Sequence, residues 1–99
     1  MSLFVVQHRH AAEACPAGSR ELAPMLLKHL SPENTRQYGI SIQGEAVIDN
    51  AHTLYLIAEA PTRSALQQFM APFAQVGSVE VLPASHCETV IERGGCAAP

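Results

Sequence analysis

A chain of 99 residues is long enough for one compact domain and too short for two. Hydrophobic residues make up 47% of it and charged residues 15%, which excludes a chain that is disordered over most of its length. The formal net charge of −3 offers no basic field for a phosphate backbone, so we expect no nucleic-acid partner. Polar residues interrupt every apolar run before membrane-spanning length, and no basic leader precedes the first run. We therefore expect a cytoplasmic protein without membrane contact.

The N-terminal part of the chain predicts a strand followed by a helix. Residues 3–10 form an apolar run that closes with alternating polar groups, which is typical of a strand. Leucines then recur at every fourth position, which favours an amphipathic helix over residues 19–30. Ser19 is a suitable N-cap, but Pro24 fits only the first turn of a helix. The helix therefore begins either at Ser19 or near Ala23.

The rest of the chain predicts three strands and a second helix. Residues 31–34 contain Ser, Pro and Asn and indicate a turn. Apolar and polar side chains alternate over residues 38–48, and a second run at 53–59 follows a turn sequence, so the two predict a hairpin. Apolar residues at helical spacing predict a helix over 62–72, and residues 78–83 predict the last strand.

The predicted order is strand, helix, strand, strand, helix, strand. This order indicates a ferredoxin-like α+β fold, a four-stranded antiparallel sheet with both helices on one face. We expect a single domain over residues 1–83 and a tail, residues 84–99, that packs on the domain or on a partner subunit. Because two helices cover only one face of the sheet, a second copy would cover the other face in a homodimer. The cleft between the paired sheets would then hold a small-molecule ligand.

The segment Thr53–Thr62, followed by Leu66, Phe69 and strand residues 79–81, resembles the dimeric α+β barrel superfamily. This group includes muconolactone-isomerase-like, YciI-like, antibiotic-biosynthesis-monooxygenase-like and stress-responsive barrel proteins, together with families of unknown function. The resemblance covers residues 3–83 and lies in the pattern of elements rather than in an active-site motif. It implies the ferredoxin-like fold and a homodimer, and it assigns no catalytic residue.

The sequence His8-Arg9-His10, followed by Cys15, carries the strongest chemical signal. Residues i and i+2 of a strand point to the same face, so the imidazoles of His8 and His10 can converge on one ion. Cys15 lies in a loop that can fold back, and two imidazoles with a thiolate suit zinc or copper. We therefore predict a transition-metal site formed by His8, His10 and Cys15. In the alternative, the histidines line a solvated strand end and Cys15 is a small buried residue.

Two other functions are compatible with the sequence. One is a cofactor-independent enzyme of the isomerase or monooxygenase-like type, with His8 or His10 as the acid/base group in the cleft between the sheets. The sequence contains no dinucleotide, P-loop, zinc-protease or serine-hydrolase motif, and its glutamates and tyrosines form no diagnostic set. The other is a regulatory dimer without catalysis.

A second group of reactive side chains follows the last predicted strand. It comprises His86, Cys87 and Cys96, and the odd total of three cysteines argues against a disulfide framework. We expect His52, at the start of the third strand, at the same end of the sheet as His86. This placement predicts a weak grouping of His52, His86 and Cys87. Cys87 and Cys96 could also form a redox pair, with Gly94-Gly95 as a flexible hinge between them. In the alternative, Cys87 is a small buried residue and Cys96 an unpaired terminal thiol.

Overall fold

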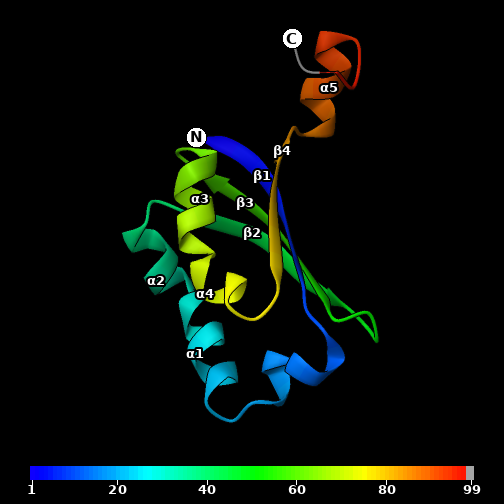
Figure 1. Ribbon diagram of the computed structural model, residues 1–99. Coiled ribbons are helices and arrows are strands. Elements are labelled where there is room, and N and C mark those ends of the chain that lie inside the picture. The colour runs from blue at the N-terminus through cyan, green and yellow to red at the C-terminus, as the bar shows by residue number, and fades with distance from the viewer. Residues whose placement is uncertain (98–99) are drawn as a thin grey trace.

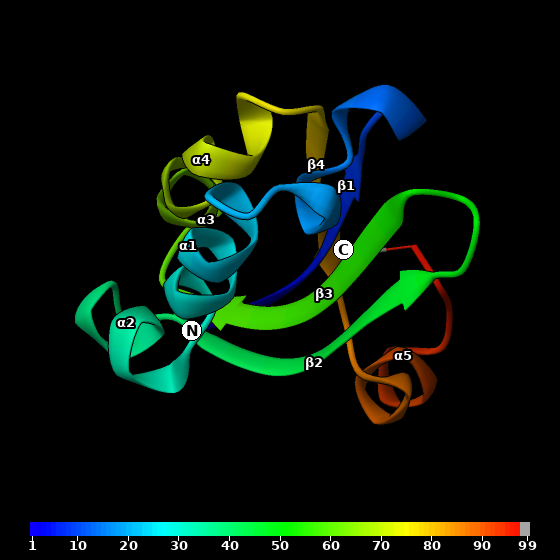
Figure 2. The same ribbon diagram turned by 90° about the horizontal axis from the view of Figure 1, so that it is seen from below.

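The computed structural model describes residues 1–97 and shows a four-stranded sheet with helices packed against it (Figure 1). The strands are β1 (Ser2–Arg9), β2 (Ser41–Ile48), β3 (Thr53–Ala60) and β4 (Ser78–Ala84). They lie in the order β2-β3-β1-β4, and every neighbouring pair is antiparallel. The helices are α1 (Leu22–His29), α2 (Pro32–Gln37), α3 (Arg63–Phe69), α4 (Ala71–Ala74) and α5 (Cys87–Arg93). Figure 2 shows α1 to α4 together on one side of the sheet. The predicted ferredoxin-like fold is confirmed.

The helices differ from the prediction more than the strands do, and prolines explain two of the differences. Residues 32–37 form helix α2, where the sequence predicted a turn over 31–34, because Pro32 fits a first helical turn and Ser31 is extended before it. The predicted helix over residues 62–72 divides into α3 and α4, and Pro72 lies in the first turn of α4. Helix α1 begins at Leu22, between the two predicted starts, and the hydroxyl of Ser19 accepts the N–H of Leu22 at 3.0 Å.

The core lies between the sheet and helices α1, α3 and α4. Alternation along β1 turns Phe4, Val6 and His8 toward these helices, and all three side chains are buried. Val6 lies opposite Leu56 of β3 and Val81 of β4, so the same face of each strand contributes to the core. The full set of buried apolar residues is Phe4, Val6, Leu26, Ile40, Leu54, Leu56, Ala58, Ala60, Leu66, Phe69, Met70, Phe73 and Val81. His8 therefore occupies a core position on a strand whose other buried residues, Phe4 and Val6, are apolar.

The other face of the sheet is not covered by helices α1 to α4 (Figure 2). Val5 lies opposite Ile57 of β3 and Leu82 of β4, and this row is apolar. Ile57 is 45% exposed and Leu82 is 42% exposed. We call Val5, Ile57 and Leu82 the open-face row.

Helix α5 lies beyond the end of β4, away from the other helices (Figure 1). Its Ile91 is 78% exposed. The Cα radius of gyration is 14.4 Å, whereas a compact chain of this length has about 13 Å. The molecule is elongated because α5 projects from it. Among residues 1–97, no helix combines the length and apolar character needed to cross a membrane.

Candidate metal centre

The antiparallel pairing of β1 with β3 brings His10 beside His52. Arg9, the last residue of β1, lies opposite Thr53, the first residue of β3. The backbone N–H of His10 donates to the carbonyl oxygen of His52 at 3.2 Å and extends this pairing by one step. His52 has a φ of +50°, a left-handed conformation that is uncommon for residues other than glycine. Such conformations concentrate at functional sites.

Cys15 lies between two short 3₁₀ turns, Ala12–Ala14 and Pro16–Gly18. Pro16 disfavours a helical conformation in the residue before it, and Cys15 is accordingly extended, with φ −61° and ψ 112°. The N–H of Cys15 donates to Ala12, and its carbonyl accepts the N–H of Gly18 at 3.2 Å. Pro16 is buried, which anchors the loop against the domain. The backbone of Cys15 is therefore hydrogen-bonded through both its N–H and its carbonyl group.

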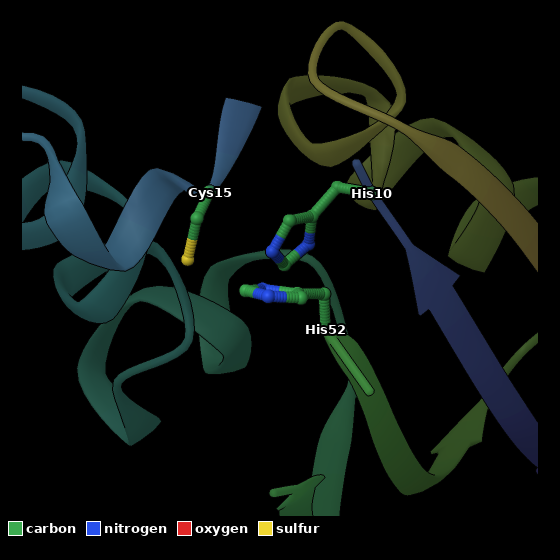
Figure 3. A group of neighbouring side chains, drawn as sticks. All are labelled: His10, Cys15 and His52. Carbon is green, nitrogen blue, oxygen red and sulfur yellow. The ribbon is translucent and has the colours of Figure 1, made fainter. Parts of the chain in front are cut away.

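His10, Cys15 and His52 form a group whose donor atoms could hold a metal ion. One ligand atom from each residue lies within 4.8 Å of the other two, and all three residues are half-buried. The rings of His10 and His52 meet edge to face, with centroids 5.1 Å apart. Figure 3 shows the sulfur of Cys15 facing the two rings. Two imidazoles and one thiolate form a donor set that suits zinc or copper.

His8 adjoins this group without belonging to it. Its ring centroid lies 5.3 Å from that of His10, and its edge packs on Phe73 at 5.2 Å. Its Nε2 points toward Gly77, where an added Cβ would lie 2.8 Å away. Of the predicted ligands His8, His10 and Cys15, the last two are in the convergent group, and His8 contacts it through His10.

His8, in β1, and His10, directly after it, carry buried nitrogens without partners. Nε2 of His8 and both ring nitrogens of His10 have no hydrogen-bond partner among residues 1–97. Burial lowers the pKa of His8, and His10 lowers it further, while the backbone of Phe73 and Val76 acts in the opposite direction. Burial also lowers the pKa of His10, with His52 as the second cause. Both imidazoles are therefore neutral at pH 7, the form that binds metal ions.

His29 shows what a structurally satisfied histidine looks like in the same domain. Its Nε2 donates to the carbonyl oxygen of Phe69 at 2.6 Å, and its Nδ1 accepts from the side-chain amide of Asn34 at 3.2 Å. The ring also stacks on Phe69, with centroids 4.2 Å apart. Both nitrogens have partners that tie α1 to α2 and α3. His10 differs because its two nitrogens are buried and unpaired, as expected for a ligand.

His52 lies at the His10 end of the sheet and not, as predicted, at the His86 end. Because β3 runs antiparallel to β1, its first residue lies at the His10 end of the sheet. Ala84, at the end of β4, lies opposite Leu3, so His86 follows at the other end. The predicted grouping of His52, His86 and Cys87 is therefore wrong. Cys87 is also exposed rather than buried. The pairing register of β1 with β3 is what identifies His52 as a neighbour of His10.

A cavity of about 480 Å³ opens beside the metal-ligand group. Its lining includes His8, His10, Cys15 and His52, together with apolar side chains of α1 and of the β2–β3 hairpin. His8 and the apolar lining residue Leu54 are neighbours across β1 and β3, on the face that carries the core. The cavity available to these histidines is therefore on the helix-covered face of the sheet. A cleft between the open faces of two paired sheets would not contain His8, contrary to the expectation from sequence.

A family model described as a domain of unknown function, DUF3303, matches residues 3–95, so the chain belongs to this family. No match was found among curated proteins. None was found among solved structures.

Proposed function

We propose that this DUF3303 protein binds a transition-metal ion, zinc or copper, through His10, Cys15 and His52. The observation that carries the proposal is the convergence of three donor atoms within 4.8 Å. These atoms come from the end of β1, the loop after it and the β2–β3 turn. Chance proximity of exposed groups accounts poorly for the buried, unpaired nitrogens of His10.

The donor set fits such an ion with small side-chain movements. Ligands bound at about 2.0–2.3 Å in a tetrahedral site lie roughly 3.3–3.8 Å from one another. Rotation of the side chains would bring the present separations, none of which exceeds 4.8 Å, into this range. Neutral imidazoles bind without first losing a proton, and the ion would convert the thiol of Cys15 to the thiolate. The fourth position stays open to water or to a bound molecule.

The set predicted from sequence, His8, His10 and Cys15, is a second choice of ligands for the same ion. We favour His52 over His8 because the donor atoms of His10, Cys15 and His52 already converge. Nε2 of His8, in contrast, lies against Gly77. His8→Leu and His52→Ala separate the two sets, since only the variant that removes a ligand should weaken binding of the metal.

Titration with Co²⁺ tests the proposal, because a thiolate ligand adds a charge-transfer absorption that histidines alone do not produce. We expect one Co²⁺ per chain with this band in the wild type. Cys15→Ser should abolish the band, and His10→Ala or His52→Ala should weaken binding at least about tenfold, as loss of one ligand removes a strong bond. Cys87→Ser and His86→Ala are matched controls, since both residues are exposed and lie at the far end of the sheet. A wild type that binds no Co²⁺, Zn²⁺ or Cu⁺ stoichiometrically would refute the metal site.

The cavity favours a second candidate, a metal-independent enzyme for a small molecule with His8 or His10 as the acid/base group. Both residues line the cavity and both are neutral at pH 7, so each could accept a proton. If this candidate is correct, the enzymatic activity survives chelation of metal ions and also survives the Cys15→Ser substitution. Activity lost on chelation and restored by the metal would reject it.

The proposal includes a homodimer formed through the open face of the sheet, as in the dimeric α+β barrel proteins. The open-face row of Val5, Ile57 and Leu82 offers an apolar strip to a second copy. Helices α1 to α4 leave this face free (Figure 2). The metal centre lies on the opposite, helix-covered face, so each subunit would keep its own site. A regulatory dimer without catalysis shares this assembly.

A further inference from the structure

The cavity beside the metal centre is lined by both polar and apolar side chains. His8 and the three proposed ligands, His10, Cys15 and His52, all line it. The apolar part of the lining comes from helix α1, the β2–β3 hairpin and α4: Leu26, Leu27, Leu30, Val47, Leu54 and Phe73. The volume of the whole cavity, about 480 Å³, is in the range of pockets that bind small molecules. Such a mixed lining suits a molecule with one polar head and an apolar tail.

The charges around the cavity indicate the sign of that head group. Glu45 and Asp49 line the cavity, and no lysine or arginine of the described chain does. An ion of charge +2, held by one thiolate and two neutral imidazoles, keeps one net positive charge and an open coordination position. The bound ion would therefore be the positive centre of a cavity whose wall otherwise carries two carboxylates, and an anionic group would bind at the ion itself.

The second charge of a dianion would meet repulsion. Glu45 lies on β2 opposite the core residue Leu56, so its side chain is on the helix-covered face. Val47 lies two residues nearer the β2–β3 turn on the same face, opposite Leu54. Along the strand, Glu45 therefore lies farther from His52 than Val47 does. A second anionic group at the far end of a ligand would lie among apolar side chains and beside this carboxylate.

We infer that the cavity binds a small apolar molecule with a single anionic head, which completes the coordination of the metal ion. The head takes the open position on the ion held by His10, Cys15 and His52, and the tail packs against α1 and β2. The inference rests on the proposed metal site, because no lysine or arginine among residues 1–97 lines the cavity to meet the head group.

Alkanoates of increasing length are the probes that test this binding. The Co²⁺-loaded protein is titrated with butanoate, hexanoate and octanoate, and the ligand-field bands of the ion are followed. We expect saturable changes in these bands, with affinity rising about fourfold for each added methylene that is buried. Octanedioate should bind at least about tenfold more weakly than octanoate, because its second carboxylate meets the apolar wall and Glu45.

Two variants of α1 locate the tail. Leu27 lines the cavity and Met25 does not, yet both are exposed, at 72% and 65%, so neither substitution should disturb the fold. Leu27→Asp should weaken octanoate binding at least about tenfold, and Met25→Asp should change it less than about twofold. Both variants should keep the thiolate band of Co²⁺, since neither residue contributes a ligand.

The outcomes separate this inference from the proposed function. Ligand-field bands that octanoate leaves unchanged, or affinities that do not depend on chain length, would overturn the ligand class and leave the metal site intact. Equal losses in Leu27→Asp and Met25→Asp would overturn the location of the tail. Absence of Co²⁺ binding would overturn both the metal site and the inference that rests on it.

Discussion

At the scale of single residues, His8 and His10 place two titratable groups on the side of the sheet where Phe4 and Val6 of β1 are buried and apolar. Burial is the main cause of the lowered pKa of each ring, and each also has a second imidazole beside it, His10 for His8 and His52 for His10. The ordinary pKa of both is 6.5. An unfolded chain would therefore take up protons at a pH where the folded chain does not.

This difference predicts that the metal-free protein loses stability in mild acid. Above about pH 6.5 both states hold neutral imidazoles, and the contribution to stability is fully present. As the pH falls from about 6.5 toward the lowered pKa values, the unfolded state binds more protons and the free energy of unfolding decreases. Urea titrations in chelator at about pH 7.5, 6.5 and 5.5 measure this slope. His8→Leu should flatten it and His86→Ala should not. If the free energy of unfolding of His8→Leu depends on pH as steeply as that of the wild type, His8 is not a source of the acid sensitivity.

The candidate ligands differ in how far sequence alone could identify them. His10 and Cys15 were predictable because they are close in sequence, and strand alternation with a short loop suffices to place them. His52 is 42 positions beyond His10 in the sequence. Its proximity depends on the antiparallel register of β1 with β3, which no local pattern specifies. Fold topology, rather than residue type, identifies this ligand.

At the scale of elements, the turn between α4 and β4 supports the end of β1. Gly77 has a φ of +155°, a conformation that favours glycine. An added Cβ would overlap the carbonyl oxygen of Arg9 and lie 2.8 Å from Nε2 of His8. The close approach of this turn to β1 therefore requires glycine, and it determines where the His8 ring can lie.

Gly77→Ala should reduce the free energy of unfolding by about 2–4 kcal/mol, from backbone strain and overlap with β1. Gly18→Ala is the matched control, because its added Cβ would meet no atom within 4 Å among residues 1–97. It should change stability by less than about 0.5 kcal/mol. Urea denaturation of the two variants beside the wild type measures the difference. Equal stabilities of Gly77→Ala and Gly18→Ala would show that the turn can relax.

The elements themselves were largely predictable, and the exceptions have local causes. All four strands coincide with runs of alternating or apolar residues, which are typical of strands in a sheet. Helix α2 was missed because Pro32 and Asn34 are typical of turns, although proline is equally suited to a first helical turn. The sequence does not predict helix α5, because its seven residues offer few apolar side chains at helical spacing. Sequence patterns reveal a helix through the apolar face that it buries against the domain. Both α2 and α5 bury few apolar side chains, so neither has such a pattern.

At the scale of the whole molecule, the metal centre and the open face lie on opposite sides of one sheet. Phe4, Val6 and His8 face the helices, whereas Val5 belongs to the open-face row. Alternation along β1 therefore assigns one set of residues to the site and the other to the proposed dimer. Substitutions on one face should leave the function of the other unchanged, which makes the two proposals separable by experiment.

The dimer is tested by a charge at the centre of the open face. Ile57 is 45% exposed and lies opposite Val5, so Ile57→Glu should preserve the fold while placing a carboxylate in the proposed interface. We expect a dimer for the wild type and a monomer for Ile57→Glu in sedimentation equilibrium at about 50 μM. Met25→Glu, an exposed apolar residue on α1, is the matched control and should remain dimeric. Co²⁺ binding should be the same in all three proteins, because each subunit holds its own His10, Cys15 and His52. A monomeric wild type, or a dimer that survives Ile57→Glu, would mean that the open face has another role.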